Sequence, residues 1–248
     1  MSLTRRGFVA LLGIALAPRA AGAQLDELLK QLPQLPGGTQ LPIPQGGLGE
    51  VKIGQALKEA LQVGTANAVK LTGKTDGYFK NAAIKILMPE KLRTLERGLR
   101  TVGYDRQLDD FVLKMNRAAE RAAPAAKQIF WNAIGDMTID DARKILDGAP
   151  TAATDYFKGK TTEKLTASFS PVVHKTMGEV GVTRQYQDLF GRAQGIPFLN
   201  VEAFDLDHYV VGKALDGLFH VVGDEEKKIR TNPSARVTDL LREVFGRR

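Results

Sequence analysis

The sequence predicts a mainly α-helical single domain, a multi-helix bundle around a kinked long helix and a central C-terminal helix, with at most a short strand pair. Apolar residues recur at three- and four-residue spacing over most of the chain after residue 51, which is the period of a helix buried on one side. With 43% apolar and 25% charged residues, the composition is that of a globular protein. The 248 residues include no Cys, which excludes disulfide scaffolds and thiolate metal sites. We therefore expect a fold held by helix packing alone.

The first 23 residues are typical of a secretory signal peptide. Arg5 and Arg6 precede an apolar run over residues 7–17, and the segment ends on the small residues Ala21 and Ala23 around Gly22. The run is shorter than the roughly 20 apolar residues that a membrane span needs. We expect cleavage after Ala23 and a periplasmic mature chain without a transmembrane span; the alternative is an uncleaved membrane anchor.

The arginine pair, in the context of residues 4–9, also resembles a twin-arginine export signal. Arg19 near the cleavage site is a charge that the general secretory route tolerates poorly, so we favour the twin-arginine route. Removing the three signal-peptide arginines from 35 basic residues leaves 32 against 28 acidic ones, and the net charge falls from +7 to +4. With that charge and no run of five basic residues, we expect no nucleic-acid partner.

Residues 24–50 are interpreted as a Gly/Pro-rich arm. Four prolines and five glycines fall between residues 31 and 49, a density that disfavours a helix or a central strand. The helical domain is therefore expected over residues 51–248.

The first elements of that domain follow from periodicity and turn residues. An amphipathic helix is predicted over residues 52–72 and ends at Gly73. Residues 74–81 predict a turn. The apolar run 84–88 before Pro89 predicts a short strand, and a helix resumes over residues 90–102.

Residues 106–135 predict a single long helix that is kinked at Pro124. Apolar positions from Leu108 to Ala133 fall on one arc when plotted at about 100° per residue, and this phase continues across the proline. Two unrelated helices would not keep a common phase, whereas a proline kinks a helix by removing one backbone hydrogen bond.

Thr138, followed by Asp140 and Asp141, is typical of an N-cap with an acidic first turn. We expect this helix to end at Gly148 and another to follow over residues 150–158.

The last part of the chain is also predicted to be helical. Helices are expected over residues 162–180, with Pro171 kinking or splitting the segment, and over residues 182–194. The helix 205–231 is apolar over more than half of its circumference, so we place it at the centre of the bundle. Asn232 and Pro233 then begin a final helix that runs to Phe245.

The common catalytic motifs fail on inspection. Gly73-Lys74-Thr75 resembles the end of a phosphate-binding loop, but Ala68 stands where that motif requires Gly. His174, His208 and His220 do not have the spacing of a zinc site. We therefore predict no cofactor.

One helix face nevertheless carries Asp216, His220 and Asp224 at four-residue spacing. Two carboxylates around an imidazole could serve acid–base chemistry or metal ligation. The same spacing is typical of a solvated ion ladder with Lys213 and Lys227, which is the commoner use of such a face.

A second set of candidates flanks the long helix. Asn116, Arg117 and Glu120 border its apolar stripe and could bind a ligand at the edge of a cleft, although ordinary boundary residues have the same pattern. Tyr78 and Phe79 in the preceding turn are candidates for a partner-binding tip, and folding back onto the core is the alternative.

Five segments carry a resemblance in their order along the chain: Lys74–Phe79, Met115–Glu120, Leu206–Val210, Lys213–Phe219 and Glu225–Arg236. In this order they resemble the bacterial family called domain of unknown function 4197. The resemblance implies an exported, mostly helical protein, and it brings no assigned activity and no catalytic residues.

We expect a non-enzymatic binding or envelope-associated protein. A cleft between the kinked helix and the helix 205–231 would accept a lipid, another apolar ligand or an envelope partner. The alternative is a hydrolase or metal-dependent enzyme that uses Asp216, His220 and Asp224, and a third option is a structural protein that the arm holds in an oligomer. Enzymatic activity is the less favoured hypothesis.

Overall fold

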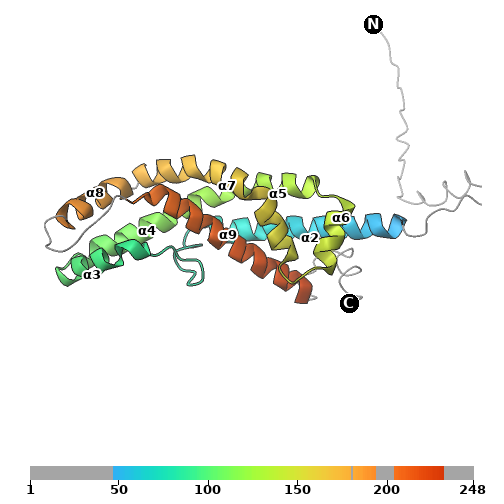
Figure 1. The fold of residues 1–248 in the computed structure, drawn as a ribbon, viewed down its shortest axis with the longest axis horizontal. Helices are drawn as coiled ribbons and strands as arrows, with labels where there is room; N and C mark the ends of the chain where they lie inside the picture. The colour runs from blue at the N-terminus through green and yellow to red at the C-terminus, as the bar shows by residue number, and fades with distance from the viewer. Residues whose placement is uncertain (1–46, 180, 194–203, 232–248) are drawn as a thin grey trace, which may run out of the picture. The chain divides into compact units, whose positions relative to one another are not determined.

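The computed structural model describes residues 47–179, 181–193 and 204–231, and most of them are helical (Figure 1). The helices are α2 (Gly47–Gly73), α3 (Arg93–Thr101), α4 (Asp105–Ala122), α5 (Ala126–Gly135), α6 (Ile139–Asp147), α7 (Ala152–Glu179), α8 (Val182–Ala193) and α9 (Leu206–Thr231), with single 3-10 turns at η1 (Glu90–Leu92) and η2 (Ala123–Ala125). All of them belong to one compact unit, Gln45–Arg248. The predicted mainly helical fold is confirmed. Across these described ranges, every helix is too short or too polar to span a membrane.

Several predicted features lie outside the described residues. They are the signal peptide with Arg5, Arg6, Ala21 and Ala23, the arm up to residue 46, and the final helix after Thr231. α2 begins at Gly47, a few residues before the predicted start at residue 52. The last proline before it is Pro44, so no proline interrupts the first turns of this helix.

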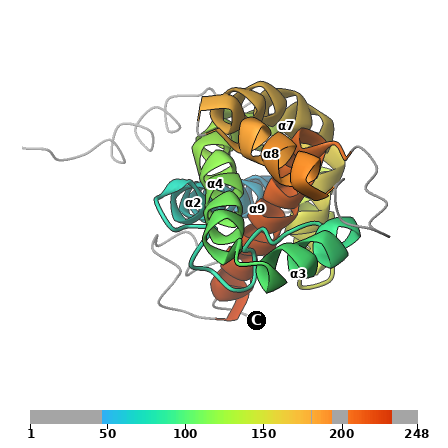
Figure 2. The ribbon, with the colours of Figure 1, turned by 90° about the vertical axis from the view of Figure 1, so that its left-hand side faces the viewer.

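α9 lies among the other helices, as its wide apolar circumference predicts. It packs against α7, α2 and α4, and Figure 2 shows it between them. Its buried apolar residues include Val210, Val211, Ala214, Leu215, Leu218, Phe219, Val221 and Val222. The Phe219 ring lies 6.2 Å from that of Phe130 on α5, which in turn lies 5.2 Å from Phe157 on α7. These edge-to-face contacts join three helices in one core.

The predicted kink at Pro124 is a single 3-10 turn between α4 and α5. Residues 105–135 are otherwise helical, and buried residues continue from Phe111 on α4 to Phe130 on α5. Because proline has no N–H to donate, the α-helical bonding pattern is interrupted where it stands.

The predicted cap at Thr138 is confirmed. The Thr138 hydroxyl accepts the Asp141 backbone N–H at 3.1 Å, and the Asp141 carboxylate accepts the Thr138 backbone N–H at 3.1 Å. This reciprocal pair is a capping box.

α7 corrects the predicted pair of helices at 150–158 and 162–180. It runs without a break from Ala152 to Glu179, with Pro171 inside it. Phe157, Thr161, Leu165 and Phe169 are buried at four-residue spacing, so one apolar face continues through residues 159–161. That continuous burial outweighs the cost of an exposed glycine in the helix, about 1 kcal/mol.

Candidate functional site

Residues 74–89 join α2 to η1 and are called the connection below. In its first turn Asp76 has a φ of +65°, and the Gly77 backbone N–H donates to the Lys74 carbonyl at 2.9 Å. A Cβ at position 77 would lie 2.6 Å from the Thr72 carbonyl oxygen, so this turn requires glycine. The tight turn directs the next two backbone N–H groups towards α4.

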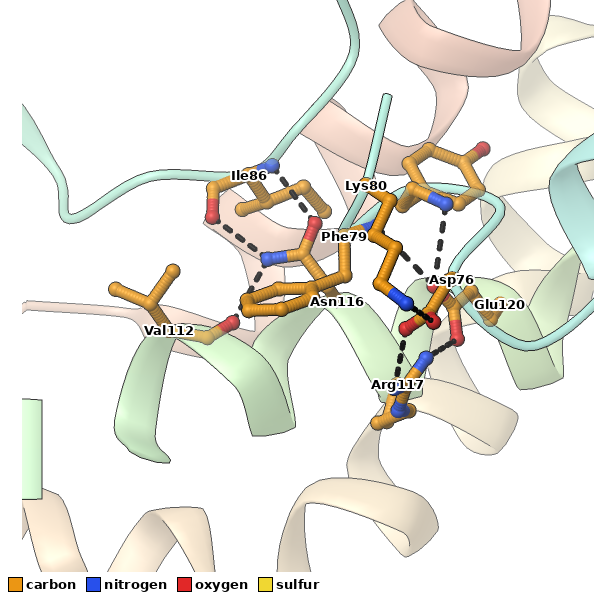
Figure 3. Close-up of polar contacts among 9 residues, drawn as sticks. Asp76, Phe79, Lys80, Ile86, Val112, Asn116, Arg117 and Glu120 are labelled. Carbon is orange, nitrogen blue, oxygen red and sulfur yellow. Dashed lines mark hydrogen bonds and ion pairs between the residues drawn. The ribbon is translucent and has the colours of Figure 1, made fainter. Parts of the chain in front are cut away.

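Glu120 of α4 receives those two groups (Figure 3). Its Oε1 atom accepts hydrogen bonds from the backbone N–H groups of Tyr78 at 3.1 Å and Phe79 at 3.2 Å. Its Oε2 atom accepts one from Arg117 Nη1 at 2.6 Å. The Glu120 side chain is only 4% exposed. A buried carboxylate is tolerated when a cation and polar hydrogens surround it, so this residue fixes the turn to α4.

Asp76 extends the same network to the surface. Arg117 Nη2 lies 2.6 Å from Asp76 Oδ1, and Lys80 Nζ lies 2.7 Å from Oδ2. The hydrogen bonds from Lys80 and Arg117 hold the pKa of Asp76 below its ordinary value.

Asn116 corrects the predicted strand at residues 84–88. Its Oδ1 atom accepts the Ile86 backbone N–H at 2.9 Å, and its Nδ2 atom donates to the Ile86 carbonyl at 2.8 Å and to the Val112 carbonyl at 2.7 Å (Figure 3). The side-chain amide therefore gives Ile86 the pair of hydrogen bonds that a neighbouring strand would give it. Residues 85–89 have no regular secondary structure, because their partner is a side chain.

Tyr78 connects the network to α9. Its hydroxyl donates to the Ala214 carbonyl at 2.6 Å, and its side chain is fully buried. Burial raises the pKa of the Tyr78 hydroxyl, which therefore keeps its proton. A Cβ on Gly217 would lie 2.6 Å from the Tyr78 ring, so a glycine there lets the ring pack closely on the helix.

The structure brings together all five residues of the predicted ligand or partner site. Asn116, Glu120 and Tyr78 are buried and bind other groups of this chain, whereas Arg117 and Phe79 are partly exposed. Tyr78 folds back onto the core, which is the alternative that the sequence left open. Because Tyr78 reaches from Glu120 on α4 to Ala214 on α9, the connection occupies the space where a ligand cleft was expected between these helices.

A second buried carboxylate, Glu226 of α9, binds the start of α7. Its oxygens accept the backbone N–H groups of Ala153 at 3.0 Å and Thr154 at 2.9 Å, and Arg230 Nη2 lies 2.9 Å from Oε1. Arg230 also donates to the Ile145 carbonyl at 2.8 Å. The carboxylate thereby acts as a cap supplied by another helix.

The strip of Asp216, His220 and Asp224 is open to solvent. The three side chains are 74%, 51% and 57% exposed, and His220 Nε2 lies 3.7 Å from Asp224 Oδ2. Lys213 Nζ lies 3.5 Å from Asp216 Oδ2, as expected for an ion ladder. The parts of the chain that the structure describes contain no group of three His, Cys, Asp or Glu residues suited to a metal ion. The catalytic role of the strip stays a prediction.

A hollow of about 510 Å³ lies between the connection and the outer face of α9, and is called the α9 hollow. It is lined by residues between positions 83 and 93, and on α9 by Tyr209, Lys213, Asp216, Gly217 and His220. The Tyr209 hydroxyl donates to the Leu87 carbonyl at 3.0 Å and so joins the two walls. This volume is within the range of small-molecule sites, about 300–1,000 Å³.

The sequence did not single out Lys85, Leu87, Arg93 or Tyr209 as site residues. They lie on three different elements, and their proximity depends on how Asn116 holds the connection. A signal was present in α9, because Tyr209 and Lys213 belong to the segments that carry the family resemblance.

Comparison with known proteins gives one result. A family model described as "Protein of unknown function (DUF4197)" matches residues 47–246. No curated protein and no solved structure matches the chain. The matched region contains the connection, the network around Glu120 and the α9 hollow, and the chain belongs to the DUF4197 family.

Proposed function

We propose that the protein is exported to the periplasm and acts there as a non-enzymatic binding protein, with the α9 hollow as the site for an apolar or amphipathic ligand. One observation carries the proposal. Within the α9 segments that carry the family resemblance, Ala214 serves the contact with Tyr78, and Gly217 borders both Tyr78 and the α9 hollow. Tyr209, Lys213 and Asp216 line this hollow of ligand size. Lys213 and Asp216 are exposed, so core packing does not explain their place in these segments.

The chemistry around the hollow supports binding rather than catalysis. Lys213, Asp216 and His220 are exposed, and catalytic groups gain most of their effect when they are preorganised in a site that excludes water. Leu87 supplies apolar surface, since it is 52% exposed in the wall of the hollow.

Export is tested by fractionating the native host and determining the N-terminal sequence of the periplasmic protein. A mature chain beginning at Gln24 supports the proposal, and an uncleaved chain contradicts it. Changing both Arg5 and Arg6 to Lys should block processing on the twin-arginine route. Normal processing of that variant would indicate the general secretory route.

Binding is tested by native mass spectrometry of the protein isolated from the periplasm of its host. We expect a non-covalent adduct that Leu87→Asp abolishes, because the charge lies in the apolar wall. Val102→Asp is the matched control, since Val102 is 60% exposed and does not line the α9 hollow. Absence of an adduct from the unmodified protein, or its survival in Leu87→Asp, would contradict the proposal.

A further inference from the structure

The α9 hollow receives cations from three separate elements. Lys85 comes from the connection, Arg93 from the start of α3 and Lys213 from α9. Two carboxylates, Glu90 and Asp216, also line it, so positive groups are in excess. Cations that converge from separate elements can surround one ligand group, which cations along a single helix face cannot do.

In both ion pairs of the hollow, the carboxylate is the more exposed member. Glu90 is 85% exposed against 55% for Arg93, and Asp216 is 74% exposed against 50% for Lys213. Their N to O distances are 3.3 and 3.5 Å, longer than the 2.7–2.9 Å or so of a strong charge-assisted hydrogen bond. Exposed pairs of this kind are weak, so both cations are available to a ligand.

Lys85 supplies the unbalanced charge. Its Nζ atom lies 4.2 Å from the centroid of the Phe79 ring, and within the described ranges no carboxylate pairs with it. Lys85 and Arg93 also line a neighbouring hollow of about 440 Å³. Phe79 lines that neighbouring hollow and not the α9 hollow, so the Lys85 ammonium group reaches a ligand in the α9 hollow only by rotation of its side chain.

We infer that the ligand of the α9 hollow is a small amphiphile with one anionic headgroup, a carboxylate or a phosphate, bound by Lys213, Arg93 and Lys85 with its apolar chain against Leu87. The inference rests on the proposed function and adds the chemical class of the ligand. A cationic ligand would meet the excess of like charge, and a neutral one would leave the cations without new partners.

The experiment is calorimetric titration of the mature chain, residues 24–248, with decanoate, decyl phosphate, decanol and inorganic phosphate, all below micelle formation. We expect decanoate or decyl phosphate to bind at one site, more tightly than decanol or inorganic phosphate. Lys213→Gln and Arg93→Gln should each weaken that binding about fivefold to tenfold, the low end for a hydrogen bond to a charged group, because both residues are half exposed. Lys227→Gln, also on the exposed side of α9 but outside the hollow, is the matched control and should leave the affinity unchanged.

The possible outcomes separate the inference from the proposed function. Equal affinity for decanol and decanoate, with loss in Leu87→Asp, would overturn the anionic headgroup and leave the binding site standing. Equal affinity for inorganic phosphate and decyl phosphate would overturn the amphiphile. A loss in Lys227→Gln as large as in Lys213→Gln would remove the α9 hollow as the place of binding. No binding of any probe, together with no native adduct, would overturn both proposals.

Discussion

Asn116 should be among the most sensitive polar positions of the domain, although it touches no proposed ligand. Changing Asn116 to Leu nearly preserves the side-chain volume and removes both hydrogen bonds to Ile86. Ile86 is 1% exposed, so its backbone N–H and carbonyl would lose their partners away from water. Each unsatisfied group costs about 1–3 kcal/mol, and burial of the leucine carbons offsets about 1–2 kcal/mol of the sum. We expect the free energy of unfolding to fall by about 1–4 kcal/mol.

The assay is urea-induced unfolding of residues 24–248 at pH 7, followed by far-ultraviolet circular dichroism. A domain of ordinary stability, about 5–15 kcal/mol, would still fold with this loss. Asn132→Leu is the matched control, because Asn132 is exposed on α5 and such changes stay within about 0.5 kcal/mol. A loss below about 1 kcal/mol in Asn116→Leu, or a loss equal to that of the control, would refute the pairing argument.

Gly217→Ala and Asp76→Asn test other contacts of the network, and Gly212→Ala is the control for the first. Gly217→Ala should lower the free energy of unfolding by about 1–3 kcal/mol, because its Cβ would lie 2.6 Å from the Tyr78 ring. Gly212→Ala has open space around it on the same helix and should raise that free energy by about 0.5–1 kcal/mol; a loss there would contradict the reasoning. Two ion pairs lower the pKa of Asp76 from its ordinary value of 3.8. The contribution of Asp76 to the free energy of unfolding is therefore complete above about pH 4, and it is lost as the pH falls through the lower pKa of the folded state. Asp76→Asn keeps a residue that accepts positive φ, and it should make the free energy of unfolding depend less on pH below about pH 4. The same pH dependence as in the unmodified protein would contradict the role of the ion pairs.

The elements that periodicity alone defines were predicted closely. The helix expected over residues 205–231 is α9, Leu206–Thr231, and the helix expected over 182–194 is α8, Val182–Ala193. Thr138 was identified as a cap because its partners lie within one turn of it. In each case the deciding interactions are local, or the apolar face is long enough to specify the helix by itself.

The wrong predictions have long-range causes. The apolar run 84–88 suits either a strand or a buried extended segment, and the choice depends on Asn116, which lies 30 residues from Ile86 in the sequence. The predicted break at residues 159–161 is wrong because buried Thr161 continues the face of α7. The α9 hollow is still harder to predict from the sequence, because its cations come from elements that only the folded connection brings together.

The buried network and the proposed site are linked through a single extended segment. Ile86 is held by Asn116 on one side, and its neighbours Lys85 and Leu87 line the α9 hollow. Asn116→Leu should therefore weaken binding of an anionic amphiphile at urea concentrations where the domain is still folded, without removing any ligand contact. Undiminished binding in that variant would mean that the hydrogen bond from Tyr209 to the Leu87 carbonyl is enough to place the wall. The buried polar residues of the family segments would then serve stability alone, and Tyr209 would be the residue that couples the connection to the site.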